Sequence, residues 1–367
     1  MTTMTEDPNA AAQQRDALGE RLFGSLLNGM ELLTVGLGVR TGLYAALRDG
    51  GPATADQLAE RAGVAERYAR EWLEQQATAG IIEVAAAGDP ATRRYSLPAG
   101  HAEALLEPDS SGYVAAAVPG LVGLAKVLEV VAAAYRSGEG VGFARYGAEI
   151  RDHISGFNRP MFVNELTSEW LPALGEVHLR LESGAPVRVL DVACGTGWSS
   201  IALAKAYPTV RVDGVDLDEA SIVEARRHAA EIGVTDRVRF TVGDVAAMDG
   251  DGGYDLACLF EALHDMGDPV GALRSVRGAL AKGAPLLVGD ERVAASFTAP
   301  GDEVERFMYA WSVLHCLPAT LAESPQVANG TVLRTDTVRA WAREAGFARV
   351  DVLPIAHDFW RFYRLET

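Results

Sequence analysis

The chain has 367 residues, of which 49% are hydrophobic and 23% charged. These proportions are typical of a soluble globular protein, and the length exceeds the usual size of a single core, so we expect two domains. The formal net charge of −17 disfavours nucleic acid as a partner, because binding to phosphate requires a surplus of Lys and Arg.

The longest apolar run spans residues 113–134, and Pro119, Lys126 and Glu129 interrupt it. This pattern indicates a buried helix, so no membrane partner is expected. The first twenty residues contain no apolar core of signal-peptide length, and only three cysteines occur in the chain. We therefore expect a cytoplasmic protein.

Residues 1–110 are predicted to form a mostly helical winged-helix domain. Apolar residues recur at helical spacing over 12–48, a threonine-capped helix occupies 53–63, and a second helix follows at 66–79. Two hydrophobic stretches after it indicate a hairpin, which completes the winged-helix order. Because the second helix carries both arginines and glutamates, we favour a role in dimerisation over one in DNA binding.

The second part of the chain alternates strands and helices. Residues 111–185 are predicted to be connecting helices, and 186–367 an α/β domain with a Rossmann-like, doubly wound sheet of seven strands, the last of them antiparallel. The segment 293–333 is too long for a plain connection, so we expect an inserted lid with its own helix. The strands are predicted at 187–192, 210–215, 237–242, 254–260, 284–289, 348–353 and near 359–364.

A glycine-rich turn follows the first of these strands. Gly195 and Gly197 lie between that strand and a helix, where the missing side chains let the backbone approach a ligand closely. Asp216 ends the second strand, nineteen residues beyond Gly197, and its carboxylate can accept hydrogen bonds from both hydroxyls of a ribose. Asp244 follows the third strand and residues 261–265 the fourth. One crevice is therefore expected to collect these polar groups.

These residues resemble the class I S-adenosylmethionine-dependent methyltransferases over about 186–367. The NAD motif would place a third glycine at the position of Ser200, a departure that favours the methyltransferase. The resemblance implies that Asp191 helps to hold the ammonium of the methionine part, that Asp216 binds the ribose and that Asp244 binds the adenine amino group. The further cofactor-binding residues expected are Leu217 and Val245, which would pack on the adenine, and Phe260.

The whole chain also resembles small-molecule methyltransferases whose N-terminal helical domain forms a homodimer and covers the active site. In that group, the segment corresponding to 260–269 holds the histidine that serves as the general base of O-methylation. The resemblance implies a metal-free mechanism in which His264 takes the proton from a substrate hydroxyl, while Asp265 or Glu261 orients its ring.

A second mechanism adds a histidine from the lid. His264, Asp265 and His315 provide two imidazoles and one carboxylate, the ligand set of a facial metal triad with open positions. A divalent or ferric ion there would chelate a 2-oxo acid and stabilise its enolate, so that carbon becomes the nucleophile. The spacing resembles that of 2-oxo-acid C-methyltransferases of the phenylpyruvate type. We favour this function over O-methylation.

Other residues remain open at the level of sequence. An apolar substrate pocket is assigned to three aromatic residues of the lid, Phe307, Tyr309 and Trp311. Arginines 145, 151 and 159 are candidates for binding a substrate carboxylate by residue type only. The pairs His357-Asp358 and Asp290-Glu291, which also lie near strand ends, rank second among the site residues. A third hypothesis is a regulator that retains the domain as a ligand sensor, although the charge balance opposes it.

Overall fold

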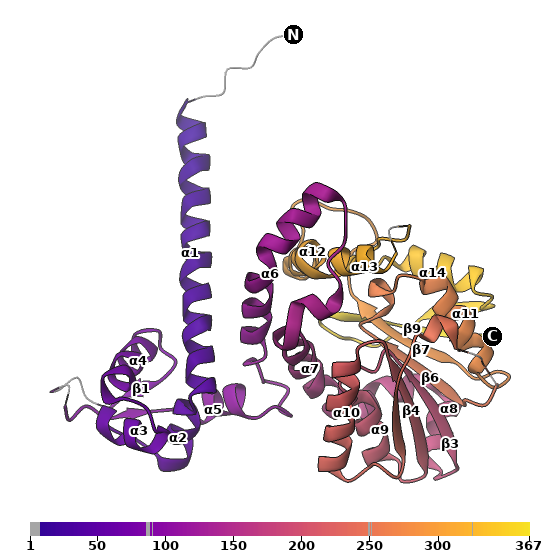
Figure 1. The fold of residues 1–367 in the computed structure, drawn as a ribbon, viewed down its shortest axis with the longest axis horizontal. Coiled ribbons are helices and arrows are strands. Elements are labelled where there is room, and N and C mark those ends of the chain that lie inside the picture. The colour runs from indigo at the N-terminus through magenta and orange to yellow at the C-terminus, as the bar shows by residue number, and fades with distance from the viewer. Residues whose placement is uncertain (1–7, 86–88, 90, 249, 251, 325) are drawn as a thin grey trace. The chain divides into compact units, whose positions relative to one another are not determined.

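A computed structural model describes residues 8–85, 89, 91–248, 250, 252–324 and 326–367. The chain forms two compact units, Met1–Pro119 and Gly120–Thr367 (Figure 1). The predicted boundary at 110 thus lies a few residues before the observed one. The helices after Gly120, which were predicted to be connectors, belong to the same compact unit as the sheet.

The first unit is a winged-helix domain, as predicted. Thr54 caps α3 by accepting a hydrogen bond from the backbone N–H of Gln57, whose side chain in turn bonds the backbone of Thr54. Gly63 ends that helix with a left-handed φ of 68°. The elements of this unit are α1 (Pro8–Arg40), α2 (Leu43–Gly50), α3 (Ala55–Ala62), α4 (Glu66–Thr78), the hairpin strands β1 (Glu83–Val84) and β2 (Tyr95–Ser96), and α5 (Ala99–Leu106).

The long helix α1 exposes many large apolar side chains. Those at least 46% exposed on its successive turns are Leu18, Leu22, Phe23, Leu26, Leu27, Met30, Leu33 and Leu37. By length and composition alone, two of the described helices, Asn9–Arg40 and Ala117–Ser137, pass the test for a membrane span. The buried core helix of a globular protein and a signal sequence near an N-terminus pass the same test.

The second unit is built on a sheet of seven strands in the order β5-β4-β3-β6-β7-β9-β8. Strands β3 to β7 are parallel, and β9 is antiparallel to both of its neighbours. The Rossmann-like fold with an antiparallel last strand is thereby confirmed, and the strand order reverses between β3 and β6, where such sheets bind ligands. The strands are β3 (Val187–Val192), β4 (Val210–Asp216), β5 (Val238–Val242), β6 (Leu256–Phe260), β7 (Leu286–Glu291), β8 (Arg349–Val352) and β9 (Trp360–Glu366).

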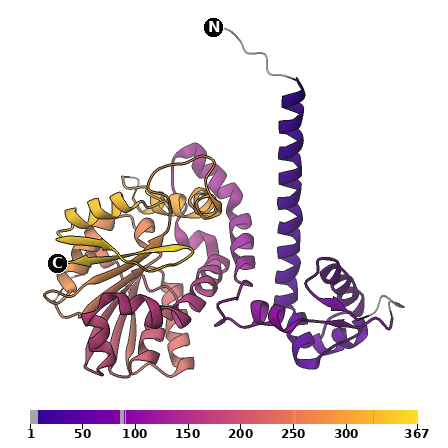
Figure 2. The same cartoon turned by 180° about the vertical axis from the view of Figure 1, so that it is seen from behind.

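Helices cover both faces of this sheet (Figures 1 and 2). Side chains alternate along β3, so Val187 and Val189 pack into one hydrophobic core, while Leu190 and Val192 pack into another. The first core includes residues of α9 (Trp198–Ala206) and α10 (Glu219–Ile232), and the second includes residues of α11 (Pro269–Ala279) and α14 (Thr335–Glu344).

The remaining helices of this unit precede the sheet or belong to the lid. Before the sheet lie α6 (Ala117–Ser137), α7 (Gly147–Asn164), α8 (Glu176–Glu182) and the short helical turns η1 (Phe143–Tyr146), η2 (Leu166–Trp170) and η3 (Leu171–Leu174). The lid consists of α12 (Glu303–Trp311), a π-helical turn η6 (Ser312–Cys316) and α13 (Leu317–Glu323). Short turns η4 (Val245–Ala247) and η5 (Leu263–Asp265) follow β5 and β6.

Candidate active site

A cavity of about 670 Å³ lies where β3, β4, β5 and β6 end. Hereafter it is called the large cavity. Seven of the eight residues that the sequence assigns to the cofactor line it, namely Asp191, Gly195, Asp216, Leu217, Asp244, Val245 and Phe260. The eighth, Gly197, is absent from the lining. Its φ of 83° and a clash of 2.5 Å between an added Cβ and Cζ of Phe240 explain why glycine is required there.

Asp216 is held between the glycine loop and the start of α10. Its Oδ2 accepts a hydrogen bond of 2.8 Å from the backbone N–H of Gly195, and its Oδ1 accepts one of 2.8 Å from that of Asp218. Burial raises the pKa of this carboxyl. The two bonds fix the carboxylate at the edge of the cavity, where it can receive ribose hydroxyls.

Asp191 is buried at the end of β3 and has two serine partners. Its Oδ2 accepts hydrogen bonds of 2.5 Å from the hydroxyls of Ser199 and Ser200. Burial raises the pKa of Asp191 to about 6, although the serine hydrogen bonds oppose this shift. Ser200, which replaces the third glycine of an NAD motif, therefore has a physical role: it orients the acid beside the glycine loop.

The remaining residues assigned to the cofactor differ in burial. Asp244 caps η4 by accepting a hydrogen bond of 2.8 Å from Ala246, which places buried Val245 at the cavity wall. Leu217 is 58% exposed. Phe260 is buried and stacks on Trp360, with ring centroids 6.1 Å apart, so it also belongs to the core.

Helix α7 contributes two polar residues that the sequence did not single out, Ser155 and Asn158, beside the candidate Arg151. On successive turns, the hydroxyl of Ser155 lies 2.7 Å from that of Thr196 in the glycine loop, and the amide of Asn158 donates to Oε2 of Glu261. One turn earlier, Arg151 lies 3.7 Å from Asp218. In the sequence, this side of the cavity is indicated only by the helical spacing of these polar residues, which match no known motif.

A second, small cavity of about 50 Å³ adjoins the large one. Ile154, Glu261 and Asp265 line both cavities. Phe307 and Trp311, two of the residues assigned to the substrate pocket, line the small cavity. Tyr309, the third residue assigned to that pocket, lines neither cavity: its hydroxyl accepts a hydrogen bond of 3.3 Å from Arg334 and its ring packs on Phe297.

His264 is buried between two aspartates. Its Nδ1 donates to Oδ1 of Asp290 at 2.9 Å, and its Nε2 lies 3.3 Å from Oδ1 of Asp265. Burial lowers the pKa of His264, but the charges of Asp265 and Asp290 outweigh that effect and raise the pKa well above its usual value.

The residue that orients this histidine is Asp290, which the sequence ranked second. Asp290 lies on β7, the strand next to β6, and it also accepts a hydrogen bond of 3.3 Å from the backbone N–H of His264. Glu261, which was also expected to orient the ring, accepts a hydrogen bond from Asn158 instead. Asp290 reaches the ring because β6 and β7 are neighbours in the sheet. The order of the strands along the chain does not show which strands are neighbours.

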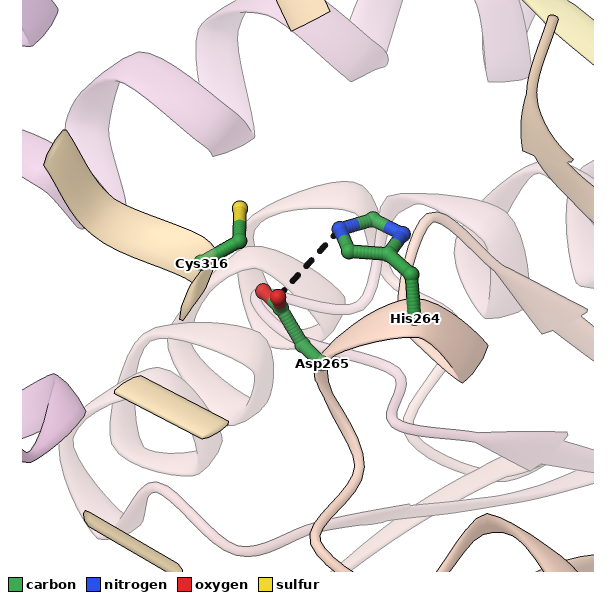
Figure 3. A group of neighbouring side chains, drawn as sticks. All are labelled: His264, Asp265 and Cys316. Carbon is green, nitrogen blue, oxygen red and sulfur yellow. Dashed lines mark ion pairs between the residues drawn. The ribbon is translucent and has the colours of Figure 1, made fainter. Parts of the chain in front are cut away.

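Among the described residues, His264, Asp265 and Cys316 form a group with one ligand atom each within 4.8 Å of one another (Figure 3). The expected third member, His315, is not part of this group. Its Nδ1 lies 3.4 Å from Sγ of Cys316, and its ring packs edge-on against Tyr146, with centroids 4.4 Å apart. The turn η6 is π-helical, so it does not place these side chains as an α-helix would.

His315 nonetheless keeps an available nitrogen. Its Nε2 is buried without a hydrogen-bond partner among the residues that the structure describes. Burial lowers the pKa of His315 to about 4, so the imidazole is neutral near pH 7. The small cavity is thus lined by imidazole, carboxylate and thiol side chains, which bind metal ions once the imidazole is neutral and the thiol has lost its proton.

The three candidate arginines lie in different surroundings. Arg151 lines the large cavity. The guanidinium of Arg159 lies 3.9 Å from the ring centroid of Trp198, a cation–π contact. Arg145 is absent from the lining of both cavities.

Comparison with known proteins supports the interpretation of this fold and cavity. Residues 184–345 match the family described as a methyltransferase domain, and residues 29–107 match the Rv2258c-like winged HTH domain. The ubiquinone biosynthesis O-methyltransferase of Stutzerimonas stutzeri (strain A1501) is 25% identical over 220 residues, which cover 59% of this chain and 85% of that protein. That of Bordetella avium (strain 197N) is 34% identical over 134 residues, 36% of this chain and 52% of that protein.

Solved structures share the fold over nearly the whole chain. An O-methyltransferase family protein from Burkholderia thailandensis has a TM-score of 0.67 at 15% identity and covers 94% of this chain and 97% of its own. Human N-acetylserotonin methyltransferase in complex with SAM has a TM-score of 0.60 at 15% identity, with 100% and 99% covered.

The domain match and the cavity at the strand ends define an S-adenosylmethionine-dependent methyltransferase. Residues 184–345 thus form a methyltransferase domain with the class I fold, and a winged-helix domain that matches over residues 29–107 precedes it.

Proposed function

We propose that this enzyme methylates the carbon beside the keto group of a small 2-oxo acid held on a metal ion by His264 and Asp265. The observation that carries the proposal is the group of metal-binding side chains in the small cavity, directly beside the large cavity. A buried, unpartnered Nε2 of His315 in the same cavity adds a further donor among the described residues.

These residues fit a metal ion by their chemistry. A neutral imidazole and a carboxylate suit zinc, iron and similar ions. A divalent or ferric ion bound there would act as a Lewis acid on the keto oxygen and lower the pKa of the neighbouring C–H group. His264 would lose its proton on binding, and Asp290 would keep the ring oriented through Nδ1.

Glu261 is placed to accept the substrate proton. Its side chain lines both cavities, and Asn158 holds its carboxylate. Its backbone has a φ of 51°, a left-handed conformation that costs a non-glycine residue roughly 1 kcal/mol or more and is found mainly at functional sites. The deprotonated substrate carbon would then face the methyl group of the sulfonium in the large cavity, in line with the breaking bond.

The small cavity favours an apolar substrate side chain. Its lining includes the rings of Phe157, Phe307, Trp311 and Phe359. Trp311 is itself held by stacking on His153, with centroids 4.7 Å apart and planes 16° apart. An apolar substrate side chain therefore suits this site better than a polar one.

Metal-free O-methylation by His264 is the second candidate. It is favoured by the His264–Asp290 hydrogen bond, which resembles the pairing of a general base with an orienting acid, and by the O-methyltransferase names of the relatives. The pKa of His264, which the charges of Asp265 and Asp290 raise, disfavours this function, because an imidazole must be neutral to take a proton.

Metal removal separates these two functions. Protein purified without chelators is expected to hold about one metal ion per chain and to release S-adenosylhomocysteine with 2-oxo acids. Chelation should abolish this activity and metal should restore it, while Asp265→Asn should lose both metal and activity. Asp302→Asn, at the cap of α12, serves as the matched control. Methylation of phenols by the chelated enzyme would instead establish the metal-free function.

We also propose that the enzyme is a homodimer formed through α1. The support is the exposed apolar surface of this helix, since monomeric proteins rarely expose contiguous apolar patches of such extent.

A further inference from the structure

We propose that Cys316 binds the metal ion as a thiolate, so that the centre consists of His264, Asp265 and Cys316 and takes a thiophilic divalent ion such as Zn²⁺, Fe²⁺ or Co²⁺. This inference rests on the metal site of the proposed function and specifies its third ligand. It distinguishes the centre from one of nitrogen and oxygen ligands alone.

The geometry places the thiol, rather than the expected imidazole, next to the pair. Figure 3 shows His264 and Asp265 on one turn, with Cys316 approaching from a separate segment of the lid. One ligand atom from each lies within 4.8 Å of the others, a separation that small side-chain movements around one ion can close. Cys316 is only 6% exposed, so the ion would be shielded from water on this side.

The backbone around Cys316 is held from two directions. The hydroxyl of Thr320 donates to the carbonyl oxygen of Cys316 at 2.7 Å. The hydroxyl of Tyr146 donates to the carbonyl oxygen of Leu314 at 2.9 Å, within the π-helical turn. These contacts fix the turn that directs the thiol, which is the kind of support that a ligand requires to be preorganised.

Binding exchanges a proton for the metal. The S–H bond of Cys316 breaks, a sulfur–metal bond forms with the sulfur electron pair, and the proton passes to solvent. Burial raises the pKa of this thiol to about 12, so it stays protonated until a cation arrives. Cys194 and Cys258 are also buried, but among the described residues neither belongs to a group of metal-binding side chains.

Cobalt substitution reads out the sulfur ligand directly. The full-length protein loaded with one Co²⁺ per chain is expected to show a thiolate-to-cobalt charge-transfer band in the near ultraviolet. Cys316→Ser should lose the band and bind Zn²⁺ more weakly by about 100-fold or more, a larger effect than that of losing a supporting residue. Cys258→Ser, which removes a buried thiol of β6, should keep the band.

A second measurement uses the wild-type protein and so does not depend on the variant folding. Zn²⁺ should slow the alkylation of Cys316, followed by mass spectrometry, and leave that of Cys194 unchanged. Bound Co²⁺ without the band, a band that survives in Cys316→Ser, or alkylation of Cys316 that is indifferent to Zn²⁺ would each overturn the assignment. If C-methylation depends on a metal while one of those results is obtained, the proposed function stands and only the assignment of Cys316 fails. If the protein binds no metal, both the function and the assignment fail.

Discussion

Asp191 shows how a single buried acid is tuned by its neighbours. Its carboxylate is surrounded by the strand ends and held by Ser199 and Ser200, and its pKa is about 6. An acid in this range is ionised at pH 7 but becomes protonated within the range in which enzymes are routinely assayed.

The affinity for S-adenosylmethionine is therefore expected to depend on pH. If Asp191 holds the ammonium, only its ionised form binds well, so affinity should fall as the pH drops below about 6, by about tenfold at pH 5. Calorimetric titration between pH 5 and 8 measures this change. Asp191→Asn should bind weakly and lose the dependence. Equal affinities of the wild type at pH 5 and pH 7 would show that this acid does not hold the ammonium.

The two glycines of the loop are expected to differ in what they tolerate. Both have positive φ, but a Cβ at Gly197 would lie 2.5 Å from Phe240, whereas one at Gly195 would meet nothing within 4 Å. The free energy of unfolding of Gly197→Ala should therefore be about 1–3 kcal/mol lower than that of Gly195→Ala, because the added methyl group overpacks the core. Thermal unfolding of the cofactor-free variants tests this, and similar losses would contradict the packing argument.

At the scale of elements, the lid depends on how its π-helical turn is supported. In a π-helical turn the backbone hydrogen bonds join residues five apart instead of four. Within this turn, the hydroxyl of Tyr146 donates a hydrogen bond to the carbonyl oxygen of Leu314. The same tyrosine ring contacts His315. One side chain thus stabilises both the backbone and a donor of the site.

Tyr146→Phe should weaken this support while keeping the ring. We expect a loss of about 1 kcal/mol, the usual contribution of one hydrogen bond, and faster amide exchange over residues 312–323. Hydrogen exchange with mass spectrometry locates the change. Tyr309→Phe removes a hydroxyl elsewhere on the lid, where Arg334 is the donor, and should leave this turn unaffected. Unchanged exchange in Tyr146→Phe would mean that the hydroxyl does not support the turn.

Regular elements were predictable from the sequence because their ends carry local signals. Helix α10 is an example, since Asp218 caps its start and Gly233 ends it with a left-handed φ of 78°. The π-helical turn has no such signal, because its apolar spacing resembles that of the helices on either side. The sequence could place His315 and Cys316 on the lid, but it could not decide which of them lies beside His264.

At the scale of the whole molecule, the fold class and the winged-helix unit were predictable, whereas contacts between distant segments were not. Asp290 reaches His264 across neighbouring strands, and Asn158 reaches Glu261 from a helix about a hundred residues earlier. Neither contact follows from periodicity, which reports only on residues that are close along the chain.

The assembly is expected to depend on α1. In this helix, Leu22 and Leu26 are 56% and 60% exposed, so the double variant Leu22→Glu/Leu26→Glu should shift the protein from dimer to monomer in sedimentation experiments by placing charges in an apolar interface. Glu20→Gln, a change at an exposed polar position of the same helix, should leave the dimer intact. A wild-type protein that sediments as a monomer at tens of micromolar would refute the homodimer.

The π-helical turn also has an evolutionary consequence. Such a turn contains one residue more than the α-helical path between the same neighbours. Deletion of a single residue within Ser312–Cys316 would return the turn to the α-helical path, so that α12 and α13 join as one regular helix without rotating against each other. A different side chain would then face His264. A one-residue gap at this point in a sequence alignment therefore marks a homologue with a different inventory of donors, even where every histidine and cysteine is retained.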